Sequence, residues 1–181
     1  MNNVFFVGKA GAGKTFSANY LIEKYDYILA KFAYPVYMIA EKYFGMIKKE
    51  RRLLQIIGTE GGRGIDKEIW IKRLFQDIEI VKKVREMEGL SEPYFVLDDC
   101  RFENEARVLI DKGWVGIYLD CPDEIRYERL NIRDGYDQRK FANHSSESSI
   151  DNFKDLLYYV DASGSLDDMY WQIDNILGGG L

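Results

Sequence analysis

Few residues of this sequence could crosslink the chain or bind a metal. Cys100 and Cys121 are its only cysteines and His144 is its only histidine, so neither a disulfide framework nor a zinc site has enough ligands. Prolines number three, no low-complexity tract occurs, and 46% of the residues are hydrophobic. That much apolar surface can offset the entropy lost on ordering. We therefore expect the 181 residues to form one folded domain, 1–181, with reduced cysteines.

A basic excess and a long apolar run are also missing. Acidic side chains outnumber basic ones by 30 to 25, which gives a net charge of -5 and argues against a nucleic-acid polymer as partner. No apolar stretch approaches the roughly 20 residues that cross a bilayer, and the first residues lack the pattern of a signal peptide. We expect a cytoplasmic protein with no membrane partner.

Short apolar runs alternate with segments of helical periodicity along the chain. The runs predict strands at 4–7, 27–32, 95–97, 115–119 and 156–160. The periodic segments predict helices at 15–25, 35–44, 66–88, 106–112, 122–132 and 166–177. The four glycines of Gly58–Gly64 predict a loop. This alternation is typical of an α/β fold with a central parallel sheet and helices on both faces.

Residues 8–15 read GKAGAGKT and match the phosphate-loop pattern G-x-x-x-x-G-K-[ST]. Three glycines permit positive φ and a close approach of backbone N–H groups to phosphate: Gly8, Gly11 and Gly13. Lys14 can reach the β- and γ-phosphates, Thr15 can bind Mg²⁺, and the following helix directs its positive end at the anion. An ordinary glycine-rich turn before a helix is the alternative, but the position between a strand and a helix favours phosphate binding.

Two acidic residues end the strand at 95–97. A phosphate loop needs a carboxylate at the end of a neighbouring strand to hold its metal, and Asp98 and Asp99 both fit. The pattern does not separate them, and a solvated turn or a helix cap is the alternative explanation for both.

Arginines gather in three places, where a second anionic substrate could be bound. They are Arg63, the pair Arg101 and Arg107, and the run Arg126, Arg129, Arg133 and Arg139. The first three of that run share one helix face, which favours a bound phosphate over a solvated helix. No N-K-x-D motif for guanine occurs, so these features favour a small kinase with a closing lid.

Several strings together resemble a known family. They are GKAGAGKT at 8–15, FAYPV at 32–36, LLQIIGTEGGR at 53–63, DDCRFENEA at 98–106 and HSSE at 144–147. This combination resembles the deoxynucleoside monophosphate kinases of tailed phages and their bacterial relatives. The resemblance implies a three-layer P-loop kinase fold like that of adenylate kinase, with a mobile monophosphate-binding segment at about 33–90 and a lid at about 126–148.

The resemblance also implies ATP and Mg²⁺ as cofactors and a (deoxy)nucleoside monophosphate as substrate. Expected ATP contacts come from Gly8, Ala10, Gly11, Ala12, Gly13, Lys14, Thr15, Phe16 and Arg129, with Ser163 to Ser165 flanking adenine. Expected catalytic residues are Lys14, Arg129 and Arg133, and expected metal ligands are Thr15, Asp98 and Asp99. Such an enzyme would act in deoxynucleotide metabolism, in host cytoplasm if a phage encodes it.

The expected acceptor contacts carry alternatives of their own. They are Gln55, Arg63, Trp70, Asp99, Arg101, Asn104, Glu105 and His144. Asn104 and Glu105 could instead cap the next helix, Trp70 could belong to the core, and His144 could simply be exposed. Many relatives of this kind are dimers, which leaves a homodimer open.

Two other functions remain. The string RYERLNIRDG at 126–135 also resembles dephospho-coenzyme A kinase, but over the last third of the chain alone. A non-catalytic domain that only binds nucleotide would share the phosphate loop as well. The accepted base and the sugar preference have no signature in the sequence.

Overall fold

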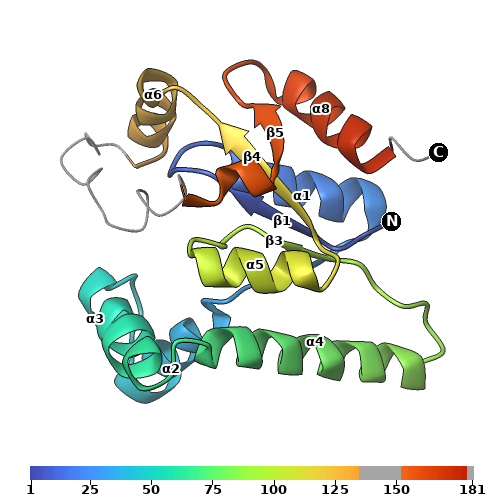
Figure 1. Cartoon of the computed structure of the whole chain (residues 1–181). Coiled ribbons are helices and arrows are strands. Elements are labelled where there is room, and N and C mark those ends of the chain that lie inside the picture. The colour runs from blue at the N-terminus through green and yellow to red at the C-terminus, as the bar shows by residue number, and fades with distance from the viewer. Residues whose placement is uncertain (135–151, 179–181) are drawn as a thin grey trace. The chain divides into compact units, whose positions relative to one another are not determined.

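The computed structural model describes residues 1–134 and 152–178. It divides into two compact units. We call Met1–Leu29 together with Tyr94–Leu181 the sheet unit, and Ala30–Pro93 the helical unit. The helical unit is thus an insertion within the sheet unit, and it includes the segment 33–90 that was expected to bind a monophosphate. Figure 1 shows the elements of both units.

The sheet contains five strands in the order β2-β3-β1-β4-β5. The strands are β1 (Val4–Val7), β2 (Ile28–Ala30), β3 (Phe95–Leu97), β4 (Val115–Asp120) and β5 (Tyr158–Asp161). β1 pairs in parallel with both β3 and β4, and β4 pairs in parallel with β5. The predicted α/β class with a parallel sheet is confirmed. The strand expected at 156–160 starts later, because Lys154–Leu156 form a 3-10 turn.

Central strand β1 is buried along its whole length, which explains its unbroken apolar sequence. Its residues Val4 and Phe6 share a core cluster with residues of α1 (Lys14–Tyr25) and α8 (Leu166–Gly178). Helix α5 (Glu103–Asp111) lies on the other side of the sheet (Figure 1). Helix α6 (Asp123–Asp134) follows β4. The sheet is therefore covered on both faces, as the alternating pattern predicted.

The helical unit contains α2 (Tyr34–Phe44), α3 (Arg51–Gln55), a π-helix at Ile56–Arg63 and α4 (Ile69–Met87). The prediction of a loop at Gly58–Gly64 was wrong. Gly58 and Gly62 are buried: Gly58 approaches Val36, and the Trp70 ring leaves no room for a Cβ at Gly62. Close packing against the Trp70 ring requires a glycine at position 62, so the glycine-rich segment forms a tightly packed helix rather than a loop.

No helix in the described ranges 1–134 and 152–178 is long and apolar enough to cross a membrane.

Candidate active site

The phosphate loop leaves the carboxyl end of β1 and runs directly into α1. Gly13 caps this helix with φ 104°, and Gly11 has φ 85°, a region that residues with a Cβ rarely adopt. Because Gly13 has no side chain, the first N–H groups of α1 are left to bind an anion. The loop therefore has the backbone form that its sequence predicted.

Lys14 lies across the loop that it follows. Its ammonium donates to the Gly8 carbonyl at 2.5 Å and to the Lys9 carbonyl at 3.1 Å. The side chain is therefore folded back over the loop, where its charge can meet a phosphate bound by the loop amides.

Thr15 joins the loop to the end of β3. Its hydroxyl donates to Asp98 Oδ2 at 2.8 Å, and Asp98 is buried. A hydroxyl beside a carboxylate fits Mg²⁺, which takes oxygen ligands and keeps several waters. No cluster of three or more His, Cys, Asp or Glu residues that could hold a metal occurs in the described part of the chain. A Mg²⁺ site that is completed by phosphate oxygens and water does not need such a cluster. Asp98 is thus the acidic residue that accepts the Thr15 hydrogen bond, and Asp99, the next residue in the chain, is half-buried.

The segment after Asp99 begins α5. Glu105 is 1% exposed, and its Oε2 accepts hydrogen bonds from the backbone N–H groups of Arg101 at 3.0 Å and Phe102 at 3.2 Å. Glu105 thus orients the start of α5, which is the helix-capping role that the sequence offered as the alternative to an acceptor contact. The side chains of Arg101 and Asn104 are exposed.

Cys100 lies within the same segment and is buried. Burial raises the pKa of its thiol well above the ordinary value, and the neighbouring Glu105 and Asp99 raise it further. The thiol therefore remains protonated and is a poor nucleophile at neutral pH.

The arginines of α6 have different surroundings. Arg126 is 2% exposed and contacts the phosphate loop. Arg129 donates to the carbonyls of Ala162 at 3.0 Å and Gly164 at 3.2 Å, in the loop between β5 and α8. Arg133 is exposed. Of the three arginines expected to share one helix face, Arg126 is thus buried against the phosphate loop and Arg133 is exposed, and phosphate binding by this face stays a prediction.

The loop between β5 and α8 is held by its own side chains as well. Asp161 accepts from the Ser163 N–H at 2.8 Å, and the Ser165 hydroxyl donates to Asp168 at 2.6 Å. Phe16, expected near ATP, is exposed on the first turn of α1. Ala10 and Ala12 lie within the phosphate loop, and Ala12 is buried.

Three expected acceptor contacts belong to the helical unit. Gln55 is exposed at the end of α3, and Arg63 is half-buried at the end of the π-helix. Trp70 is buried, and its indole N–H donates to the Gly58 carbonyl at 2.8 Å. Trp70 thus supports the π-helix, as a core residue would. His144 lies outside the described residues.

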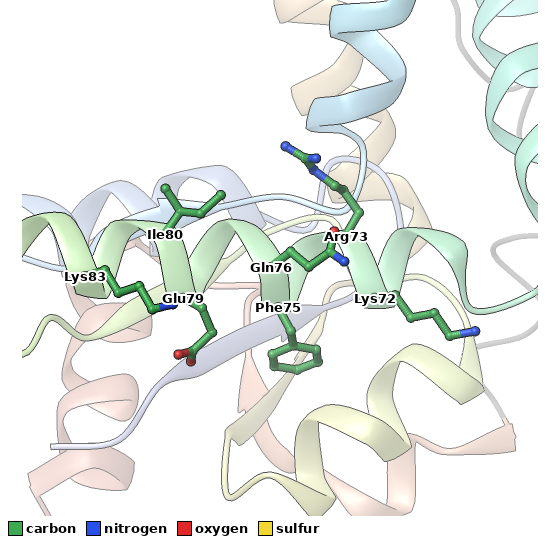
Figure 2. Close-up of a pocket in the computed structure, with 7 residues that line it drawn as sticks. All are labelled: Lys72, Arg73, Phe75, Gln76, Glu79, Ile80 and Lys83. Carbon is green, nitrogen blue, oxygen red and sulfur yellow. The ribbon is translucent and has the colours of Figure 1, made fainter.

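Helix α4 also borders a pocket of about 510 Å³ (Figure 2). Phe75 and Glu79 extend from one side of the helix, whereas Arg73 extends from another. Lys72 forms an ion pair with Asp66 at 2.7 Å. The polar side chains that line the pocket do not converge on a common point, so this pocket is a weaker candidate for the active site than the phosphate loop.

A family model described as an AAA domain matches residues 4–149. The chain belongs to this family. Its match includes the phosphate loop and Asp98, so the loop geometry and the family together imply ATP binding. No curated protein matches the chain in sequence.

Solved structures of low sequence identity share the fold. TT1252 from Thermus thermophilus has a TM-score of 0.58 at 18% identity, covering 100% of both chains. A sugar kinase from Janibacter sp. HTCC2649 has a TM-score of 0.57 at 16% identity, covering 98% of this chain and 95% of its own. Shikimate kinase from Bacteroides thetaiotaomicron has a TM-score of 0.57 at 14% identity, covering 98% of each chain. At these identities the comparison establishes a P-loop kinase-like fold.

Proposed function

We propose that this protein is an ATP-dependent small-molecule kinase whose acceptor is the 5′-phosphate of a (deoxy)nucleoside monophosphate. The observation that carries the proposal is the link from Thr15 to Asp98 at 2.8 Å, beside a phosphate loop crossed by Lys14. This arrangement can hold both the phosphates and the metal of a nucleotide.

The protein's part in such a transfer is positioning and neutralisation of charge. The loop amides and Lys14 hold the phosphate chain, and Thr15 with Asp98 provides the oxygen ligands for Mg²⁺. Bound Mg²⁺ would supply charge neutralisation at the β- and γ-oxygens. Arg133 is exposed at the end of α6, and the proposal assigns it the stabilisation of charge on the transferred group.

A phosphate acceptor suits the arginines that the resemblance assigns to acceptor binding. A monophosphate is already largely ionised at neutral pH, so the acceptor needs no general base. Arg101 in the sheet unit and Arg63 in the helical unit carry the planar guanidinium groups that bind phosphate in a bidentate manner. Both belong to the strings that resemble phage-type deoxynucleoside monophosphate kinases.

A hydroxyl acceptor is the second candidate. Two structures of similar fold are named as a sugar kinase and a shikimate kinase, and the 126–135 string resembles dephospho-coenzyme A kinase. A hydroxyl must lose a proton during transfer, and in this alternative we assign its acceptance to Asp99, a half-buried carboxylate next to Asp98 in the chain.

An ADP-release assay with ATP, Mg²⁺ and a panel of acceptors tests the proposal. The panel contains ribo- and deoxyribonucleoside monophosphates, dephospho-coenzyme A, shikimate and simple sugars. We expect monophosphates to stimulate ADP release, and Lys14→Ala to reduce it at least a hundredfold. The control is Lys112→Ala, because Lys112 precedes β4 at the amino ends of the parallel strands, whereas the phosphate loop follows the carboxyl end of β1.

The outcomes separate the candidates. Stimulation by dephospho-coenzyme A, shikimate or a sugar alone would replace the monophosphate by a hydroxyl acceptor. ATP binding without acceptor-dependent ADP release would indicate a non-catalytic nucleotide-binding domain. A fully active Lys14→Ala variant would contradict the assignment of the site.

A further inference from the structure

Arg126 is a buried arginine at the phosphate loop. Its side chain is 3% exposed, and arginine is rarely buried unless paired. Its Nε donates to Asp123 Oδ1 at 2.7 Å, and one Nη donates to the Tyr127 hydroxyl at 3.0 Å. The other Nη donates to the carbonyl of Ala10 at 3.5 Å. The guanidinium thus links α6 to the loop while Asp123 balances its charge.

Neighbouring contacts place the first turn of α6 against three consecutive loop residues. A Cβ at Gly11 would collide with the backbone oxygen of Arg126, so helix and loop touch through their backbones. Lys9 lies 3.6 Å from Asp123 in an ion pair. The hydrogen bond from Arg126 is also the main reason that the pKa of Asp123 is lowered, so this carboxylate stays charged at neutral pH.

The hydrogen bond from Arg126 to the Ala10 carbonyl also affects the backbone N–H group of Gly11. The Ala10 carbonyl and the Gly11 N–H belong to one peptide group, and the structure contains no cis peptide bond among the described residues. In a trans peptide the two groups point in opposite directions. A cation that holds the carbonyl therefore fixes the direction of the N–H away from α6 and polarises it as a donor. Backbone N–H groups of this kind bind phosphate in such loops.

We propose that Arg126 is a positioning residue that holds the Ala10–Gly11 peptide with its N–H directed at the nucleotide phosphates. Asp123 keeps Arg126 in place, and Tyr127 lies under the guanidinium at 4.2 Å from the ring centroid. The inference rests on ATP binding by the loop and is independent of the acceptor.

Isothermal titration calorimetry with ATP, and separately with inorganic tripolyphosphate, tests this role without an acceptor. We expect Arg126→Met to raise the Kd for both ligands about tenfold, equivalent to about 1.4 kcal/mol. The binding of ATP and the binding of tripolyphosphate should weaken by the same factor, because the contact acts on phosphate binding. Arg126→Lys should restore part of the affinity, since an ammonium keeps the charge and one donor but loses the fork.

Arg85→Met is the matched control. Arg85 also donates to a backbone carbonyl, that of Ser91 at 3.2 Å, but it lies on α4 of the helical unit and not at the phosphate loop. Its Kd values should equal those of the wild type. Asp123→Asn is a second variant that leaves Arg126 intact, and it should weaken ATP binding several-fold in the same direction.

Two results would overturn the proposal. One is an Arg126→Met protein whose Kd values stay within twofold of the wild type. The other is an equal loss in the Met and Lys variants together with an equal fall in the Tm of the unliganded proteins, which would assign Arg126 to packing alone. Failure of the proposed kinase activity would be seen separately, as absent ADP release by a wild-type protein that binds ATP.

Discussion

Single residues of the site combine structural and chemical roles. Thr15 donates to the buried Asp98, and the proposed function also gives it the role of a metal ligand. Glu105 is buried and accepts two backbone N–H groups at the start of α5. The sequence predicted Thr15 from the phosphate-loop motif, whereas the role of Glu105 required the structure, because a helix cap and a substrate contact share the same residue type.

Thr15→Val tests the link between the loop and β3. The variant keeps the shape of the side chain but removes the hydroxyl, so the buried Asp98 loses a donor. We expect the free energy of unfolding to fall by about 1–3 kcal/mol. We also expect the Mg²⁺ concentration for half-maximal ADP release to rise about tenfold. Urea unfolding without nucleotide and a Mg²⁺ titration measure the two effects. Thr15→Ser should resemble the wild type, and a Val variant that does so too would exclude the metal role.

Glu105→Ala tests whether this acid caps the helix or binds the acceptor. Loss of a cap leaves two N–H groups without their carboxylate, so we expect a loss of about 1–2 kcal/mol in unfolding free energy. The KM for the acceptor should change little. Glu103→Ala is the control, because it removes a partly exposed i,i+4 pair that contributes little. A large rise in KM without a loss of stability would return Glu105 to the acceptor site.

At the scale of elements, the local pattern predicted most strands and helices but not the π-helix. The strands at β1 and β3 follow from short apolar runs, since both are buried in the sheet. The π-helix at Ile56–Arg63 contains three glycines, and its contacts with Trp70, through the ring at Gly62 and the hydrogen bond to the Gly58 carbonyl, have no local signature in the sequence. Similarly, helical spacing grouped Arg126 with the other arginines of α6. The burial of Arg126 could not be predicted from that spacing, because it depends on the contact with the phosphate loop.

Helices α1 and α8 are joined by a carboxylate that receives three donors. Asp174 accepts from Tyr20 at 2.6 Å, Tyr25 at 2.8 Å and Lys24 at 2.7 Å, and Tyr20 stacks on Tyr170. Burial by itself raises the pKa of Asp174, but hydrogen bonds from Lys24, Tyr20 and Tyr25 outweigh it and leave the pKa below its ordinary value.

This lowered pKa predicts the pH dependence of stability. A carboxylate with a depressed folded-state pKa contributes stability above its unfolded-state pKa of about 3.9, and the contribution is lost as the pH falls through the folded value. We expect Asp174→Asn to lower the unfolding free energy at pH 7 by about 1–2 kcal/mol, with the difference from the wild type shrinking below about pH 4. Urea unfolding across pH 3–7 measures it. Asp167→Asn on the same helix is the control, and an equal, pH-independent loss in both variants would contradict the account.

For the whole molecule, the nucleotide contacts are predicted in the sheet unit, whereas the acceptor contacts are predicted in both units, with Arg101 in the sheet unit and Arg63 in the helical unit. The phosphate loop, Asp98 and α6 belong to the sheet unit, and the π-helix with Arg63 belongs to the helical unit. The sequence anticipated both segments through their motifs. The expected bounds of about 33–90 lie three residues inside each end of Ala30–Pro93, because the exact ends depend on which residues pack together rather than on local pattern.

Hydrogen exchange can observe this division directly. ATP with Mg²⁺ should slow amide exchange in the phosphate loop and the first turn of α1, because bound phosphates occupy those N–H groups. An accepted nucleoside monophosphate should slow exchange at Ile56–Arg63. Mass spectrometry of peptides from the two segments measures both effects, and Lys14→Ala should abolish the first. Protection of Ile56–Arg63 by tripolyphosphate alone would contradict the assignment of that segment to the acceptor.

The insertion of the helical unit also bears on how the chain folds. β3 pairs with β1, yet the whole of Ala30–Pro93 separates β2 from β3 in the chain, and the Ile28 N–H donates to the Tyr94 carbonyl at 2.8 Å where the two ends meet. Joining those ends closes a long loop, and the entropic cost of closure grows with the length of flexible chain. A helical unit that has already folded shortens that flexible length. The central sheet should therefore assemble faster when the helical unit folds first. Mutations that weaken the packing around Trp70 would then slow the folding of the sheet, although Trp70 itself is part of the helical unit.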